Sequence, residues 1–216
     1  MKTNNPANPK NKFDYVGDIH NQIVSVYVQK YGRKERPVNE ICLLTQEIAS
    51  ENEDIQKLPD ADANIKVDCD LIKKGIEDFT NQFENIVASF DISEAAKFKL
   101  QELINYNFEI SFQVEDTEYS LYYNHVVEYE DSIINNDQYS KKDVKILLSA
   151  SSTARYAGYY WKMELNETSL TTSAQRRKWW QWAIIGAADL AGAFEGIGTA
   201  AAASGAAYTI TNPEKK

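Results

Sequence analysis

The two histidines are the first side chains in the sequence that could do chemistry. His20 has Asp18 nearby and His125 has Glu128 nearby, so one histidine from each of two helices could hold a divalent metal ion together with carboxylates. Asp18 and His20 are two positions apart and face different sides of a helix, however, and His125 with Glu128 fits an ordinary surface pair. A structural role for both histidines is therefore favoured over a metal site, and no cofactor is expected.

Other catalytic chemistry finds little support in the residue patterns. The sequence contains no HExxH, CxxC, GxSxG or phosphate-loop pattern. Glu128, Glu130 and Asp131 could form a catalytic pair or a cation site, but catalytic carboxylates need a cleft, so a solvated face is favoured. A group of aromatic residues could stack on a carbohydrate or a base, but core packing is favoured. These are Tyr119, Tyr122, Tyr123, Tyr129, Tyr156, Tyr159, Tyr160 and Trp161. We expect a non-enzymatic protein.

The composition is that of a folded globular protein. The chain has 216 residues, of which 43% are hydrophobic and 25% are charged, so it is long enough to bury a core as one domain. The net charge of −9 has the wrong sign for binding phosphate backbones, so nucleic-acid binding is not expected. Cys42 and Cys69 are too few for a disulfide scaffold or a four-thiolate zinc site, and their spacing leaves open whether they pair.

Charge is unevenly distributed along the chain. The 13 basic and 26 acidic residues before Ser140 give −13, whereas the ten basic and six acidic residues from Ser140 onward give +4. This asymmetry fits an interaction surface, and it also fits docking of the last helices on an acidic bundle, which we favour.

The spacing of apolar residues predicts helices along most of the chain. The predicted helices span residues 14–31, 37–48, 71–90, 93 onward, 116–134, 140–165 and 179–210. The fold class is therefore all-α, a helical bundle of about six or seven helices with a C-terminal small-residue helix that resembles a glycine zipper. We expect a flexible N-terminal tail over 1–12, a single helical domain over 13–211 and a C-terminal tail over 212–216.

The secondary structure of three stretches is less clear from the sequence. The β-branched residues at 23–28 leave a strand open as an alternative within the first helix. Residues 51–62 are charged and contain Pro59, so they predict a surface loop. Residues 106–114 alternate apolar and polar side chains as a half-buried strand does, but no partner strand is evident, so we expect the helix to continue.

The C-terminal segment differs in kind from the rest. Ala188, Gly192, Gly196, Ala200 and Ser204 recur every four residues and place small side chains along one helical face, which another helix can approach closely. The residues that precede this small-residue repeat combine positive charge with indole rings, as an interfacial membrane anchor does. They are Arg176, Arg177, Lys178, Trp179, Trp180 and Trp182.

Two acidic residues weigh against a membrane span in this segment. Asp189 and Glu195 lie within 179–210, and an acidic residue near the bilayer centre costs about 2.5–3.5 kcal/mol on the insertion scale. We therefore expect the helix to pack inside the bundle, with Gly192 and Gly196 at a close helix crossing.

Three segments carry a resemblance to a known group of proteins. Residues 13–17 (FDYVG) with His20 and Asn21, residues 151–161 (SSTARYAGYYW) and the Ala/Gly-rich tail resemble an uncharacterised family of bacterial proteins, chiefly from Bacteroidetes. The resemblance implies a lipoprotein-type signal ahead of an Asn/Pro-rich spacer, and hence an envelope location, but this chain has no cysteine near its start. It implies no activity.

The residues leave the location of the protein open and favour a binding role. If Met1 is the native start, the absence of an apolar signal stretch predicts a cytoplasmic protein, whereas a removed signal segment would predict an envelope or secreted one. We expect a helical interaction protein that binds a protein partner or itself. The alternative is a membrane-active protein of bacteriocin or toxin type that inserts residues 179–210 and so contacts membranes through its C-terminal helix.

Overall fold

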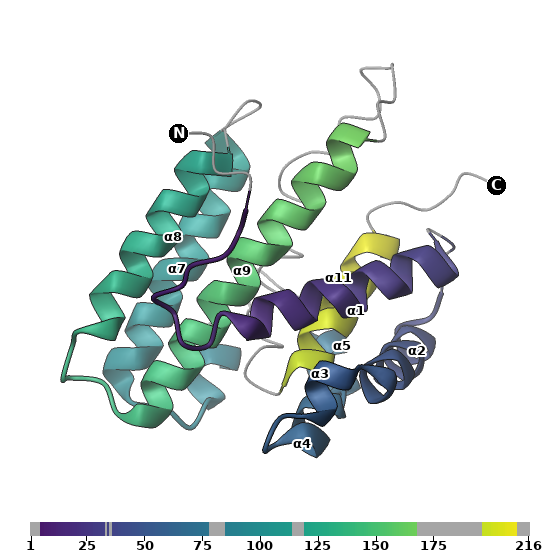
Figure 1. The fold of residues 1–216 in the computed structure, drawn as a ribbon, viewed down its shortest axis with the longest axis horizontal. Helices are drawn as coiled ribbons and strands as arrows, with labels where there is room; N and C mark the ends of the chain where they lie inside the picture. The colour runs from purple at the N-terminus through teal and green to yellow at the C-terminus, as the bar shows by residue number, and fades with distance from the viewer. Residues whose placement is uncertain are drawn as a thin grey trace.

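The computed structural model describes residues 5–32, 34, 36–77, 85–113, 119–167 and 196–210. All regular secondary structure in these ranges is helical, which confirms the all-α prediction (Figure 1). The named helices are α1 (Tyr15–Tyr31), α2 (Val38–Glu51), α3 (Glu53–Gln56), α4 (Ala61–Ile65), α5 (Cys69–Glu77), α7 (Glu94–Gln113), α8 (Tyr119–Ile134), α9 (Lys141–Glu167) and α11 (Ile197–Ile210). The count within the described ranges exceeds the predicted six or seven because α3 and α4 are short additional turns.

The helices surround two hydrophobic cores. One core lies among α1, α2, α3, α5 and α11 and contains Ile23, Tyr27 and Ile41. The other lies among α7, α8, α9 and residues 85–90 and contains Leu100 and Ile133. Helix α9 belongs to both, because it packs along α8 and also crosses α1, as Figure 1 shows. The α1–α9 contact therefore joins the two halves of the molecule.

Helix α1 shows why apolar spacing predicted this fold well. Its residues at three- and four-residue spacing, among them Val16, Ile19 and Ile23, are all buried. The β-branched side chains at 23–28 do not form a strand, because burial against α9 and α11 outweighs their weak intrinsic preference. Gly32 ends the helix with a positive φ of 60°, and its N–H donates to the Val28 carbonyl, as helix-terminating glycines do.

Two of the less clear stretches are helical. Helix α7 continues through Gln113, so the helical prediction for 106–113 is confirmed, whereas residue 114 lies outside the described ranges. The surface loop predicted over 51–62 is wrong in part, because α3 lies within it and Ile55 is fully buried. The many charges of this stretch predicted an exposed loop, although the stretch contains one core residue and the cap of α3. In this cap Asn52 Oδ1 accepts hydrogen bonds from Asp54 N and Ile55 N.

The helix predicted over 71–90 is described at its two ends. Helix α5 begins earlier, at Cys69, and runs to Glu77, and residues 85–89 are also helical. Ile72, Ile86 and Phe90 of the predicted apolar stripe are buried. Residues 78–84 lie outside the described ranges.

The prediction of a flexible tail over 1–12 is wrong for residues 5–12. This stretch lies against α8 and α9, and its Asn8 and Asn11 side chains are only 4% and 2% exposed. Its polar composition suggested a solvated tail, but these amides are satisfied by buried hydrogen-bond partners rather than by water.

The start of α9 is capped as predicted. Ser140 N donates to Asp143 Oδ2 at 3.0 Å, and Asp143 N donates to Ser140 Oγ at 3.1 Å, which is a capping box with an aspartate in place of glutamate. Ser93 N also donates to Asp143 Oδ1 at 2.9 Å, so this carboxylate fixes the start of α7 as well. Burial alone would raise the pKa of Asp143, but these hydrogen bonds outweigh it and the net shift is downward.

Replacing Asp143 with asparagine should lower the free energy of unfolding by about 1–2 kcal/mol at neutral pH, because a charge-assisted cap is lost. The pKa of Asp143 is lower in the folded chain, so its contribution is fully present above the unfolded value of about 3.9 and is lost as the pH falls through the folded value. Urea titrations at several pH values should therefore show the difference from the unsubstituted chain narrowing below about pH 4. Asp137→Asn, in the exposed turn before α9, is the matched control. A difference that is independent of pH would contradict the assignment.

Candidate functional site

Described parts of three segments that the sequence singled out, residues 13–21, residues 151–161 and the Ala/Gly-rich tail, meet inside the fold. Asp14, just before α1, contacts Arg155 of α9, and Gly17 contacts Ser152 of the same helix. His20 lies one turn further along α1 and contacts α11 through Ser204. The opening, the internal segment and the Ala/Gly-rich tail thus form one contact region, which is the candidate site.

A buried ion-pair cluster lies at its centre. Arg155 and Glu130 are both fully buried, and Arg155 Nη2 and Nε donate to Glu130 Oε1 at 3.0 and 3.2 Å. Arg155 Nη2 also donates to Asp14 Oδ1, and Tyr156 donates its hydroxyl to Asp14 Oδ2 at 3.1 Å. One guanidinium is therefore shared by two carboxylates from different parts of the chain.

The same cluster holds residues 5–11. Asn8 Nδ2 donates to Glu130 Oε2 at 2.6 Å, and Asn11 Nδ2 donates to Glu130 Oε1 at 2.7 Å. Arg155 Nη1 donates to the Pro6 carbonyl. Tyr123 donates its hydroxyl to the Ala7 carbonyl at 2.8 Å. Polar and charged side chains of α8 and α9 therefore fix the N-terminal stretch.

The carboxylates of the cluster stabilise the charge of Arg155. Burial disfavours the guanidinium charge, but the carboxylates of Glu130 and Asp14 outweigh that effect and raise the pKa of Arg155. Burial, and then the charge of Asp14, raises the pKa of Tyr156, so its hydroxyl remains a neutral donor. Glu130 accepts hydrogen bonds on both carboxylate oxygens from side chains of the chain itself. This arrangement satisfies a buried charge and leaves its acceptor positions occupied.

The sequence did not reveal this cluster. The prediction that Glu130 belongs to a solvated face is wrong, because its carboxylate is fully buried in the ion pair. A usable signal was Arg155, which stands alone as a charged residue in the small and aromatic run 151–161. A charged residue in such a run is either exposed or buried with an acidic partner.

Close backbone contact brings α1 against α9. A Cβ on Gly17 would lie 2.6 Å from the Ser152 carbonyl oxygen and 2.6 Å from Cδ2 of Tyr156. Gly17 N donates to Ser152 Oγ at 3.2 Å, and Asn21 Nδ2 donates to the Tyr156 carbonyl at 2.8 Å. Only glycine permits this crossing.

Gly17→Ala should lower the free energy of unfolding by about 1–3 kcal/mol, because a backbone oxygen that cannot rotate away opposes the added methyl group. Gly158→Ala is the matched control, since its added methyl would meet the side chain of Tyr122 at 2.9 Å, and a side chain can move. Thermal melting of both variants measures the difference. Equal losses of stability in the two variants would show that the α1–α9 backbone contact relaxes as readily as the Tyr122 side chain moves.

The two histidines are not brought together by the fold. His20 is fully buried, with Nδ1 3.0 Å from Asn21 Oδ1 and Nε2 3.2 Å from Ser204 Oγ. His125 lies on α8, where its ring stacks on Tyr106 of α7, and Glu128 is exposed. Across the described ranges, no three His, Cys, Asp or Glu side chains gather as a metal ion would require.

The aromatic group packs mainly in the core, as predicted. Tyr119, Tyr129, Tyr156 and Trp161 are buried, and Tyr122, Tyr123, Tyr159 and Tyr160 are half-buried. Tyr119 donates its hydroxyl to the Arg155 carbonyl at 2.9 Å, a buried hydrogen bond. These residues are therefore packing groups around α8 and α9.

The C-terminal helix is interior. Every residue from Ile197 to Ala207 is buried, and α11 packs against α1, α2, α4 and α5. Gly196 precedes the helix with a φ of 125°, so the prediction of one continuous helix over 179–210 is wrong at this residue. The predicted candidates Arg176, Arg177, Lys178, Trp179, Trp180, Trp182 and Gly192 lie outside the described residues.

None of the helices in the described part of the chain combines the length and apolarity needed to cross a membrane.

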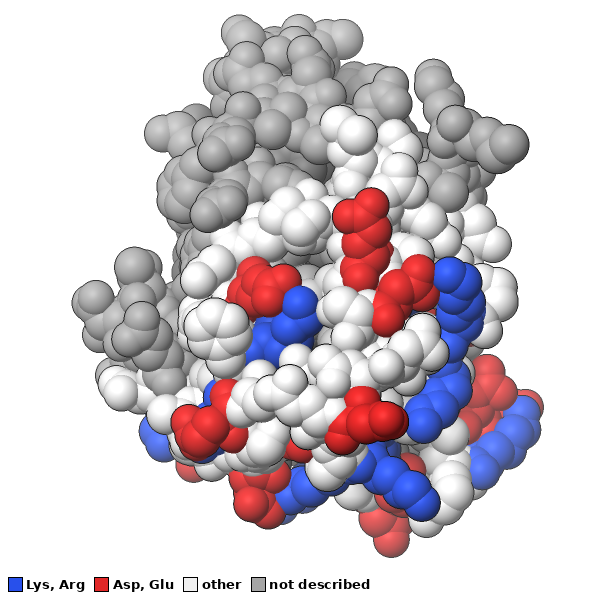
Figure 2. Space-filling view, turned by 90° about the vertical axis from the view of Figure 1, so that its left-hand side faces the viewer, with Lys and Arg blue, Asp and Glu red and all other residues white. Residues whose placement is uncertain are grey.

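The described surface mixes charges of both signs. Figure 2 shows Lys and Arg beside Asp and Glu in the lower half of one face. Ion pairs between residues far apart in sequence include Lys10–Asp131 at 2.9 Å and Lys145–Asp60 at 2.7 Å. The second of these joins α9 to Asp60, just before α4.

Comparison of the chain with protein-family models, curated proteins and solved structures finds no match to any of them.

Proposed function

We propose that this chain is a non-enzymatic helical interaction protein in which α11 is the internal packing helix. The observation that carries the proposal is the complete burial of residues 197–207 among α1, α2, α4 and α5. A helix enclosed on all sides by its own chain supports the fold. Binding then falls to the outer faces of the surrounding helices.

The ion-pair cluster supports a non-enzymatic role. Arg155 and Glu130 are fully buried, and their polar atoms bond to Asp14, to Ser151 and to the stretch 6–11. A catalytic acid or base must reach a substrate proton. Here the buried charges of Arg155 and Glu130 instead hold three parts of the chain together.

The disulfide between Cys42 and Cys69 supports an envelope or secreted location. Disulfides form and persist in oxidising compartments and are rare in the reducing cytosol. This agrees with the envelope location that the family resemblance implies.

A membrane-active protein is the second candidate, because residues 197–210 contain no charged side chain. Dye release from anionic lipid vesicles loaded with a self-quenched dye distinguishes the interaction protein from the membrane-active protein. The oxidised full chain is expected to release no more dye than buffer does. Release at sub-micromolar protein would favour the membrane-active alternative.

The interaction itself can be tested with photo-crosslinking residues on outer faces. Phe98 on α7 is 76% exposed and Leu43 on α2 is 70% exposed, so both can be replaced without disturbing the cores. Crosslinkers at these positions, used in the cells that make the protein, are expected to give discrete adducts with a protein or a second copy of the chain. Adducts with lipid alone would contradict the proposal.

A further inference from the structure

The amino end of α11 lies against one short stretch of backbone, residues 63–68. A Cβ on Gly196 would lie 2.6 Å from the Ala63 carbonyl oxygen, and a Cβ on Gly198 would lie 2.8 Å from that of Ile65. Both glycines therefore allow main chain to contact main chain. The stretch covers the first turn of α11 directly.

Hydrogen bonds join the same two segments. Ile197 N donates to Asn64 Oδ1 at 3.4 Å, and Thr199 Oγ1 donates to the Lys66 carbonyl at 3.3 Å. Asp68 N donates to Thr199 Oγ1 at 3.0 Å. The polar groups at this end of α11 are thus satisfied by residues 64–68.

The other contacts of the stretch 61–68 are limited: Ala61, Ile65 and Val67 pack half-buried against the core, and Val67 N donates to Gln46 Oε1 at 3.2 Å. Helix α4 has no buried residue, and none of residues 61–68 is fully buried. A segment with so little apolar burial belongs to the least stable part of a fold unless it is tied down. Its contact with α11 therefore needs an additional constraint.

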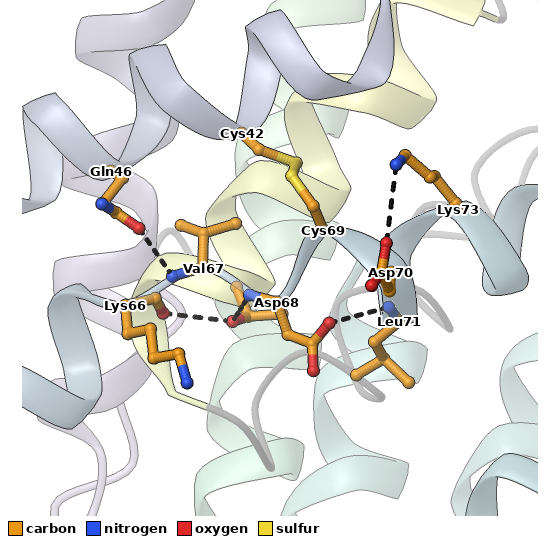
Figure 3. Close-up of a disulfide and its surroundings, with 10 residues drawn as sticks. Cys42, Gln46, Lys66, Val67, Asp68, Cys69, Asp70, Leu71 and Lys73 are labelled. Atoms are coloured by element: carbon orange, nitrogen blue, oxygen red, sulfur yellow. Dashed lines mark hydrogen bonds and ion pairs between the residues drawn. A yellow bond between two sulfur atoms is a disulfide. The ribbon is translucent and has the colours of Figure 1, made fainter.

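The disulfide supplies that constraint. Cys69 follows Asp68 directly and is bonded to Cys42 of α2, a helix that itself packs on α11. Figure 3 shows this bond beside the hydrogen bonds of Lys66, Val67 and Asp68. The bond fixes one end of the stretch to α2, so the chain cannot swing away from α11.

We propose that the Cys42–Cys69 disulfide is a redox-sensitive latch that controls exposure of the amino end of α11. In the oxidised chain residues 63–68 cover this end. In the reduced chain they separate from it, while α7, α8 and α9 keep their packing. The proposal rests on the proposed function, in which α11 is the enclosed helix.

The reductant would be a dithiol. Cys69 is half-buried whereas Cys42 is 3% exposed, so a thiolate of the dithiol attacks Cys69 Sγ. The Cys42–Cys69 bond breaks, a mixed disulfide forms, and Cys42 leaves as a thiolate that takes up a proton. The second thiol of the reagent then displaces Cys69 and closes a cyclic disulfide. Two electrons and two protons pass from the dithiol to the protein.

Amide hydrogen exchange on the full chain tests this latch. The oxidised chain is compared with the same chain in dithiothreitol and with the double variant Cys42→Ala/Cys69→Ala in buffer without reductant. Reduction should speed exchange at residues 197–201 by about 10- to 100-fold, because the closed loop no longer opposes local opening. Exchange at residues 147–155 of α9 should change by less than about twofold, because the buried apolar residues of this part of α9 pack in the other core, with α7 and α8.

The control is Asn52→Ala, which removes the cap of α3, a helix that contacts α4, without removing any of the contacts of α11 described above. This variant should leave exchange at 197–201 at the oxidised rate. The latch is overturned if reduction leaves these amides unchanged, or if α9 accelerates by the same factor and the whole chain unfolds. Adducts with lipid or release of dye would overturn the proposed function but would not alter the exchange result, so the two can fail separately.

Discussion

Replacing Arg155 with methionine is expected to lower the free energy of unfolding by about 3–5 kcal/mol. The substitution keeps much of the apolar volume but leaves the carboxylates of Glu130 and Asp14 without their cation. Glu130 is fully buried, so its charge cannot be solvated instead. Urea unfolding followed by circular dichroism measures the change.

A double-mutant cycle shows whether the loss comes from the unpaired charge. Adding Glu130→Gln to Arg155→Met removes that charge and should recover part of the stability, because the amide oxygen still accepts hydrogen bonds. Lys145→Met breaks the surface pair with Asp60 and should cost less than about 1 kcal/mol. A loss for Arg155→Met as small as that of Lys145→Met would show that the cluster is not a structural centre.

Gly196→Leu is expected to destabilise the fold by about 3 kcal/mol or more, from two causes that add. A positive φ of 125° is strained for a residue with a side chain, which costs about 1–3 kcal/mol. The side chain would also press on the Ala63 carbonyl, where even a Cβ lies at 2.6 Å, and overpacking costs about another 1–3 kcal/mol. Denaturant titration of the purified variant measures the sum.

Gly205→Ala provides the comparison within α11. The atoms nearest to a Cβ there belong to the side chains of Ile41 and Tyr27, at 3.3 Å, and the residue is helical. Its effect should therefore be well below that of Gly196→Leu. If Gly196→Leu were as stable as the unsubstituted chain, the contact between residues 63–68 and α11 would not exist in solution.

Helical periodicity predicted the elements because their apolar residues pack on one face. The spacing of Val16, Ile19 and Ile23 gave α1, and the pair Ser140 and Asp143 marked the start of α9. These are local patterns, because all the residues of each pattern lie within a few turns of one helix.

The contacts that define the candidate site were not predictable in the same way. Asn8 and Glu130 are separated by more than a hundred residues, and each on its own has the composition of a solvated surface. The pairing of Cys42 with Cys69 depends on the position of α5 against α2, which spacing does not contain.

Gly196 shows how a correct pattern can be assigned to the wrong structure. Its place in a four-residue repeat of small side chains predicted a close approach within a helix. The close approach is present, but Gly196 precedes α11 and meets the backbone of α4. The repeat continues in Ser204, whose hydroxyl lies 3.2 Å from His20 Nε2.

The burial of α11 within its own chain is the central claim, and hydrogen exchange of the oxidised full chain tests it most directly. If α11 is enclosed by α1, α2, α4 and α5, the amides of residues 201–207 should exchange only through global unfolding, at rates within about tenfold of those in the middle of α9. Exchange of these amides near the rate of an unprotected peptide, while α9 remains protected, would show that α11 is not an interior helix and would contradict the account.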